Sequence, residues 1–275
     1  AKNKVAITDA QTENKVAGGG LFVHYASITD KKACVFVNTE VRNKDSVAKT
    51  ITVENTILNA DNKIVGKASS TLLLAAGEAK TFVQKINVSR PNLWSPESPY
   101  LYNLISKVKD SKTILDGGKT KIGIRSFAFK GKDGFWLNGR KYRQFVGANR
   151  HQDFAYVGNA LPNSQQWRDA SRLKDAGFNI IRTAHYPQDP AFMDACDELG
   201  LFVIVNTPGW QFWNDAPEFA QRVYSDIRNM VRRDRNHPCV WLWEPILNET
   251  WYPAAFAKNT LDLVAQEYPY PHCYS

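Results

Sequence analysis

The sequence contains few cysteines and no long apolar segment. Its four cysteines among 275 residues show neither CxxC spacing nor the density of a disulfide-stabilised scaffold, so we expect buried or incidental thiols. No apolar run approaches the roughly 18 to 20 residues that a membrane span requires, and no apolar signal core follows the first four residues. We therefore expect no membrane association. A cytoplasmic and a periplasmic location both stay open, because the chain is either intracellular or begins after its signal.

Dense basic blocks are absent too. The formal net charge is +8, but Lys and Arg are scattered along the chain with acidic residues among them. Surfaces that bind nucleic acid combine clustered cations with aromatic side chains, and no such block is present. The hydrophobic content of 43% and the charged content of 23% are ordinary for a globular protein of one or two domains. We expect an ordered chain without a nucleic-acid partner.

The first part of the chain has the pattern of an antiparallel β-protein. Short runs rich in β-branched and aromatic residues alternate with turns rich in Asn, Asp and Gly. Regular short strands of this kind predict an immunoglobulin-like β-sandwich over residues 21–130, with residues 1–20 as a leader or linker. The strands are expected at residues 33–42, 50–58, 80–88, 100–108 and 120–129.

Residues 131–275 show strands that alternate with amphipathic helices. Repeated βα units predict a parallel sheet with right-handed crossovers, and no GxGxxG turn follows any strand to mark a dinucleotide site. Four such units are half of the eight in a (β/α)8 TIM barrel. The predicted fold class is multi-domain, an immunoglobulin-like β-sandwich followed by the N-terminal half of a TIM barrel. Strands are expected at residues 142–149, 178–183, 201–206 and from 239, and helices at 164–175, 190–199, 216–233 and 254–267.

Polar and aromatic residues follow each of these four strands. Because barrel enzymes carry their chemistry at the C-terminal ends of strands, these residues are candidates for one site. Amide, imidazole and carboxylate groups suit sugar hydroxyls, and indole rings suit the apolar faces of a sugar. Simpler interpretations stay open, with the histidines as hydrogen-bonding loop residues and Arg182 as an ion-pair partner between strand ends. The candidates are Asn149, His151, Asp153, Arg182, His185, Trp210, Trp213, Asn248, Glu249 and Trp251.

Glu249 is the strongest catalytic candidate. It closes an apolar run that reads as a strand buried on both faces, and burial there would raise the pKa of the carboxyl and make it a proton donor near neutral pH. Glu244 competes with it, but its mid-strand position before Pro245 favours a structural ion pair or a place lower in the pocket. Asp234 and His237 precede the strand, which places them on the opposite, stabilising face as helix-end and turn residues.

Four ordered motifs carry a family resemblance. They are the runs Gly147-Ala148-Asn149-Arg150-His151, Asn179 to Pro187, Arg233-Asp234-Arg235-Asn236-His237-Pro238, and Trp243 to Glu249. All four resemble glycoside hydrolase family two, which holds the β-galactosidases, β-glucuronidases and β-mannosidases. Residues 93–102 and 123–127 resemble the end of that family's immunoglobulin-like domain, so the likeness extends over most of the chain.

The resemblance implies roles for individual residues. Glu249 would be the general acid/base of a retaining hydrolase, and Asn248 would bind the 2-hydroxyl of the sugar that is cleaved. The remaining pocket positions would be Asn149, His151, Asp153, Arg182 and His185. The family's large β-galactosidases carry an acidic, His-containing run after the third strand that helps bind magnesium. Val205-Asn206-Thr207-Pro208 replaces that run here, so no metal and no other cofactor is expected.

The resemblance also implies that this chain is a fragment. In the family the nucleophilic Glu comes from a later barrel strand, so we expect a carbohydrate substrate, a β-galactosidase-like activity of the whole enzyme, and an inactive isolated chain. Unpaired edges of a half barrel make a homo-oligomer an open expectation. Glucuronides and mannosides stay open as substrates. Two alternatives remain, namely a carbohydrate-binding or scaffold fragment without turnover, and a barrel metallohydrolase with His151, Asp153 and His185 as ligands.

Overall fold

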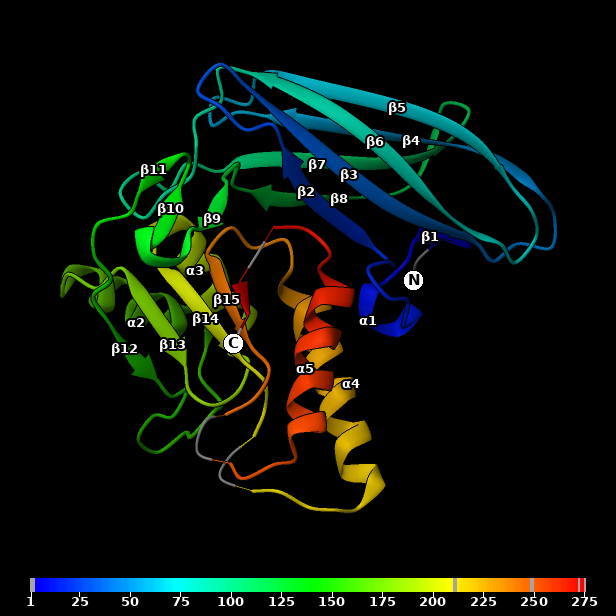
Figure 1. Ribbon diagram of the computed structural model, residues 1–275. Helices are drawn as coiled ribbons and strands as arrows, with labels where there is room; N and C mark the ends of the chain where they lie inside the picture. Colours follow the sequence, from blue (N-terminus) through cyan, green and yellow to red (C-terminus); the bar gives the residue numbers. More distant parts are fainter. Residues whose placement is uncertain (1–2, 210–211, 248–249, 272, 275) are drawn as a thin grey trace. The chain divides into compact units, whose positions relative to one another are not determined.

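The computed structural model describes all residues except 1–2, 210–211, 248–249, 272 and 275. The chain divides into two compact units (Figure 1). The first, here called the sandwich unit, comprises Ala1–Leu93 and Tyr100–Ser126. The second, here called the barrel unit, comprises Trp94–Pro99 and Phe127–Ser275.

The sandwich unit consists of two antiparallel sheets. One has the order β1-β3-β2, with β6 also paired to β3, and the other has the order β5-β4-β7-β8. This confirms the predicted β-sandwich. Its elements are β1 (Val5–Ile7), α1 (Ala10–Glu13), β2 (Leu21–Ala26), β3 (Lys32–Asn43), β4 (Lys49–Leu58), β5 (Ile64–Leu74), β6 (Ala79–Ser89), β7 (Tyr102–Asp110) and β8 (Thr113–Ile122).

The sandwich core contains a buried polar layer between two apolar clusters. Val53 and Ile57 of β4 belong to different clusters, and Asn55 lies between them in the inward-facing alternation. Its side-chain amide donates to Thr39 Oγ1 and to Gln84 Oε1, each at 3.0 Å. A buried amide without partners would be costly, so these bonds stabilise the layer and fix the register of the strands that supply it.

Two short segments belong to other parts of the fold than the sequence predicted. Residues 1–20 were expected as a leader or linker, but β1 pairs antiparallel with β3 and the Val5 side chain is fully buried. The segment 94–99 was expected inside the sandwich, yet it clusters with the barrel unit, where Trp94 Nε1 donates to the Asp197 carbonyl at 2.8 Å. Both associations depend on partners that are distant in sequence.

The barrel unit contains a three-stranded antiparallel sheet followed by alternating strands and helices. The three-stranded sheet has the order β11-β10-β9. The elements are β9 (Phe127–Phe129), η1 (Gly131–Asp133), β10 (Phe135–Leu137), β11 (Arg140–Lys141), β12 (Gly147–Arg150), α2 (Asn163–Asp175), β13 (Ile180–Thr183), α3 (Pro190–Leu199), β14 (Phe202–Asn206), α4 (Pro217–Asp234), β15 (Val240–Glu244), α5 (Ala254–Glu267) and β16 (Cys273–Tyr274).

The parallel sheet of the barrel unit has five strands in sequence order, β12-β13-β14-β15-β16. Sequential order with helical crossovers is the arrangement of a TIM barrel, so the predicted half barrel is confirmed, with β16 as the beginning of a fifth strand. Among the described residues, no helix is both long enough and apolar enough to cross a membrane.

A buried ion pair lies at the end of the sheet where its strands begin. At the edge where β15 begins, Asp197 of α3 accepts hydrogen bonds from the Cys239 backbone N–H at 2.8 Å and lies 2.6 Å from His237 Nδ1. Burial alone would lower the pKa of His237, but the Asp197 carboxylate outweighs this and raises the pKa to about 9. His237 is therefore a structural ion-pair partner, in agreement with the non-catalytic role expected for it. Asp234 pairs with Arg233 beside it.

Gly200 tests the attachment of residues 94–99 to the barrel unit. It ends α3 with a φ of 75°, and a Cβ atom there would lie 2.4 Å from the Pro96 carbonyl oxygen. We expect Gly200→Ala to lower the free energy of unfolding by about 2–4 kcal/mol, since left-handed strain and a backbone clash add. Gly177→Ala is the matched control, because its φ is 87° but no atom lies within 4 Å. Denaturant unfolding of both variants measures the difference, and equal losses would contradict the clash.

The His237–Asp197 pair gives the stability a pH dependence. The folded-state pKa of about 9 lies above the ordinary value of 6.5, so the pair's contribution is complete below pH 6.5 and disappears as the pH rises through 9. We expect the loss to be on the order of 1–3 kcal/mol. Thermal unfolding between pH 6 and 10 measures it, with His237→Gln as the reference. A variant that loses stability as steeply as the parent over this window would refute the assignment.

Candidate functional site

The candidate site lies at the C-terminal edge of the parallel sheet. Asn149 of β12 is in register with Arg182 of β13, and Arg182 is in register with Ile204 of β14. These three side chains line one cavity of about 400 Å³, so they share one face of the sheet. The structure therefore brings together two residues, Asn149 and Arg182, that the sequence assigned to a common pocket.

A polar network joins three strands at this edge. Arg182 Nε donates to Glu244 Oε2 at 2.7 Å, and the Arg182 Nη2 group donates to Oε1 of the same carboxylate. Asn206 Nδ2 donates to Glu244 Oε2 at 2.8 Å. A bidentate guanidinium–carboxylate pair is a strong and directional contact. Glu244 is thus in an ion pair, as expected, although it ends β15 and does not lie in mid-strand. Arg182 holds neighbouring strand ends together.

The two candidate histidines lie close to each other. The rings of His151 and His185 are 5.8 Å apart between centroids and nearly perpendicular. The Gln152 N–H, next to His151, donates to the Tyr186 hydroxyl at 2.8 Å, which ties the loop after β12 to the loop after β13. Asp153 is exposed in the same loop. Imidazole groups gathered at this edge can donate and accept hydrogen bonds from a hydroxyl-rich ligand.

The tryptophan candidates that the structure describes lie in different environments. Trp213 is half-buried and packs against Phe256 with ring centroids 4.7 Å apart. Trp251 is 92% exposed, so it contributes no enclosed surface in the described structure. Trp210 lies outside the described residues. Trp243 is buried and Trp241 belongs to an aromatic cluster with Phe145, so both pack in the core.

Asn248 and Glu249 lie outside the described residues. They follow β15 in the sequence, and the described residues on either side of them, Leu247 and Thr250, both line a second cavity. The catalytic assignment of Glu249 and the sugar contact of Asn248 therefore stay predictions.

The metallohydrolase ligands do not assemble. Among the described residues, the side chains whose ligand atoms lie within 4.8 Å of one another are those of Asp197, His237 and Cys239, at the opposite edge of the sheet. His151, Asp153 and His185 form no such group. The His237–Asp197 pair and the Cys239 backbone engage both oxygens of the Asp197 carboxylate, so this cluster is satisfied by hydrogen bonds.

Asn206 and Thr207 are polar residues at this edge to which the sequence assigned no role. Asn206 is fully buried, and within the described residues its Oδ1 has no hydrogen-bond partner. Thr207 Oγ1 is likewise buried and without a partner in the described part of the chain. Their position directly at the end of β14 was the available signal, because polar strand-end residues face the site of a barrel.

Glu244→Gln tests the network across the strands. The substitution removes the charge and turns an NH₂ group toward a donor of Arg182 or Asn206, so we expect a loss of about 2–3 kcal/mol in the free energy of unfolding. Asp262→Asn is the control, since the Lys258–Asp262 pair is exposed and should contribute less than about 0.5 kcal/mol. Urea denaturation compares the two, and a Glu244 variant as stable as the control would show that the network is not stabilising.

Both units match known families. Residues 20–125 match "Glycosyl hydrolases family 2", and residues 128–266 match "Glycosyl hydrolases family 2, TIM barrel domain". Among solved structures, the Bacteroides uniformis β-glucuronidase superposes with a TM-score of 0.88 at 27% identity, over 98% of this chain and 34% of that one. A family 2 member from Bacteroides cellulosilyticus superposes with a TM-score of 0.87 at 28% identity, over 100% of this chain and 37% of that one.

Curated relatives extend the likeness to named enzymes. A β-galactosidase of Thermoanaerobacter pseudethanolicus is 36% identical over 84% of this chain and 30% of its own length. Beta-galactosidase BoGH2A of Bacteroides ovatus is 32% identical over 90% of this chain and 30% of its own length. The chain thus spans about 30% of the length of these relatives. By both its sandwich unit and its barrel unit, the chain belongs to glycosyl hydrolase family 2, a family of β-glycoside hydrolases.

Proposed function

We propose that this chain supplies the proton-donating part of a retaining β-glycoside hydrolase of the β-galactosidase type. The observation that supports this most is the gathering of Asn149, Arg182 and the two histidines at the catalytic edge of a family 2 half barrel. Glu249 follows the fourth strand of that sheet, where a general acid of this reaction belongs.

The roles follow from the chemistry of retaining hydrolysis. Glu249 donates a proton to the leaving oxygen and later deprotonates the attacking water, and Asn248 binds the sugar 2-hydroxyl. His151, His185 and Asn149 bind other hydroxyls of the same sugar. Arg182 and Glu244 hold three strand ends in place, so they position the groups that touch the substrate.

A galactoside fits these residues better than a glucuronide. The uronic acid of a glucuronide carries a carboxylate that needs a cationic partner. Arg182 is the arginine among the predicted pocket residues, and its guanidinium is engaged with Glu244. A neutral sugar needs only the amide and imidazole groups. Relatives of both names exist, and the β-galactosidase of T. pseudethanolicus is 36% identical.

The second carboxylate of the mechanism is proposed to lie outside these 275 residues. Retaining hydrolysis needs a nucleophile about 5 to 5.5 Å from the acid/base, and no residue of this chain matches the family position for it. The chain by itself is therefore expected to bind a sugar without turnover. Homo-oligomer formation stays a prediction.

Glu249→Gln tests the acid/base in the protein that carries this sequence at its natural length. General acid catalysis contributes roughly 10²–10⁴-fold, so kcat/KM for an alkyl β-galactoside should fall by about that factor. An aryl galactoside with a good leaving group needs little protonation and should lose less in the glycosylation step. Steady-state and pre-steady-state rates on both substrates measure the contrast.

Glu218→Gln, at an exposed acid in the first turn of α4, is the control and should keep the parental rates. Parental activity of the Glu249 variant on the alkyl galactoside would contradict the role of Glu249. Faster turnover of the matching glucuronide would contradict the preferred substrate class. Glu249-dependent turnover by the 275-residue chain alone would overturn the placement of the nucleophile.

A further inference from the structure

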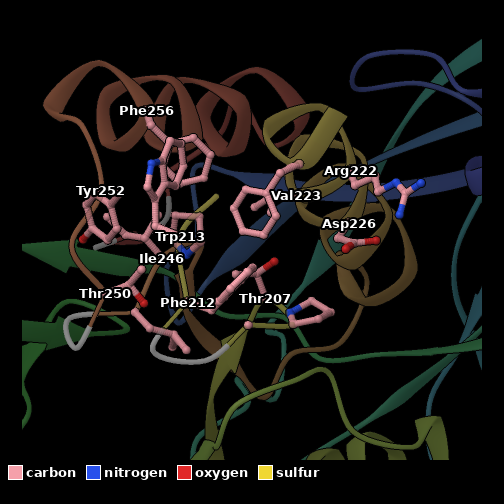
Figure 2. A pocket seen from close by; sticks show the side chains of 15 residues that line it. Thr207, Phe212, Trp213, Arg222, Val223, Asp226, Ile246, Thr250, Tyr252 and Phe256 are labelled. Carbon is pink, nitrogen blue, oxygen red and sulfur yellow. The ribbon is translucent and has the colours of Figure 1, made fainter. Parts of the chain in front are cut away.

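A second cavity of about 340 Å³ lies in the barrel unit, and Figure 2 shows the side chains that line it. It is bounded by the loops that follow β14 and β15 and by the first halves of α4 and α5. Its volume is within the range of small-molecule sites, which is about 300–1,000 Å³. Because both loops follow the C-terminal ends of parallel strands, this cavity opens at the catalytic edge of the sheet.

The wall of this cavity is largely apolar and aromatic. Trp213 packs edge-on against Phe219 at 5.5 Å and against Phe256 at 4.7 Å between ring centroids. Tyr252 also packs against Phe256, with ring centroids 5.8 Å apart. Figure 2 shows Trp213, Tyr252 and Phe256 together on one side and the charged groups of α4 on the other. Such a wall favours a flat apolar ligand, since aromatic rings prefer offset or edge contacts with one another.

One polar group of the wall has no partner. Thr207 is 2% exposed, and its Oγ1 has no hydrogen-bond partner among the residues that the structure describes. Its backbone N–H donates to the Glu244 carbonyl at 3.0 Å, which fixes this residue next to the Arg182–Glu244 network. A buried hydroxyl without a partner is costly and suits a ligand oxygen that is present only in the complex.

Two residues of this wall flank the predicted acid/base in the sequence. Leu247 and Thr250 both line the cavity, and they are the described residues on either side of Asn248-Glu249. The proton donor of a glycosidase acts on the oxygen that joins the sugar to its leaving group. A cavity bordered by the flanks of that donor is therefore suited to the part of the substrate that leaves.

We propose that this cavity binds the leaving group of the substrate and selects an apolar alcohol, aromatic or long-chain aliphatic, in preference to a second sugar. The proposal rests on the proposed glycosidase function. A second sugar would need polar partners for its hydroxyls as well as an aromatic platform, and the wall that contains Trp213, Phe219 and Phe256 is mostly apolar. Thr207 would donate to the oxygen of the alcohol.

Binding of a free alcohol tests the cavity without any need for turnover. The 275-residue chain should bind 4-nitrophenol saturably in calorimetry or ligand-observed NMR, and it should not bind glycerol. Trp213→Ala should weaken 4-nitrophenol binding at least fivefold, while Trp213→Phe keeps most of it. Tyr156→Ala is the matched control, because Tyr156 is fully exposed and does not line the cavity. Circular dichroism of each variant verifies folding.

The outcomes are distinct. Absence of saturable binding to the 275-residue chain would overturn the proposal. This holds also if the reason is that another part of the protein or a second copy fills the cavity. Equal loss in the Tyr156 variant would also overturn it. In the protein at natural length, Trp213→Ala and Thr207→Val should lower kcat/KM for aryl galactosides more than for methyl galactoside, and equal effects on both would refute selection by this cavity. If Glu249→Gln is fully active, the glycosidase assignment fails while the binding result stands by itself.

Discussion

The bidentate contact between Arg182 and Glu244 is the constraint on which the candidate site depends. These residues are 62 positions apart, on strands separated by β14, and Asn206 of that middle strand joins the same carboxylate. Three consecutive strand ends are thereby held in one arrangement. Asn149 of the adjacent β12 is in register with Arg182, so its position is tied to the same arrangement.

Because of this constraint, Arg182 and Glu244 serve to position other residues. The guanidinium and the carboxylate bond to each other, and under the proposed function the amide and imidazole groups would recognise the hydroxyls of a neutral sugar. The loops after β12 and β13 carry His151 and His185, whereas the loops after β14 and β15 line an aromatic cavity. A glycoside has the same division between its hydroxyl-rich sugar and its leaving group.

Much of the fold was predictable from local patterns. The helices α3 and α5 have the expected bounds, and the strands of the parallel sheet lie within a few residues of the expected ones, apart from β12, which is confined to the end of the strand expected at 142–149. The strand β5 was missed because it lies at a sheet edge and much of its outer face is polar or exposed. The strand expected at 120–129 is divided between β8 and β9, which belong to different units.

The sequence by itself determined the alternation of elements, the residues that end each strand and the family to which they belong, because periodicity and ordered motifs are local properties of a chain. Only the tertiary structure decided that Arg182 pairs with Glu244 and that Trp213 lines a different cavity from Asn149 and Arg182. It also decided that segment 5–7 belongs to the sandwich unit and segment 94–99 to the barrel unit. Each of these outcomes is a contact between residues far apart in sequence. Which partners meet depends on strand register and loop path, and local composition does not encode either.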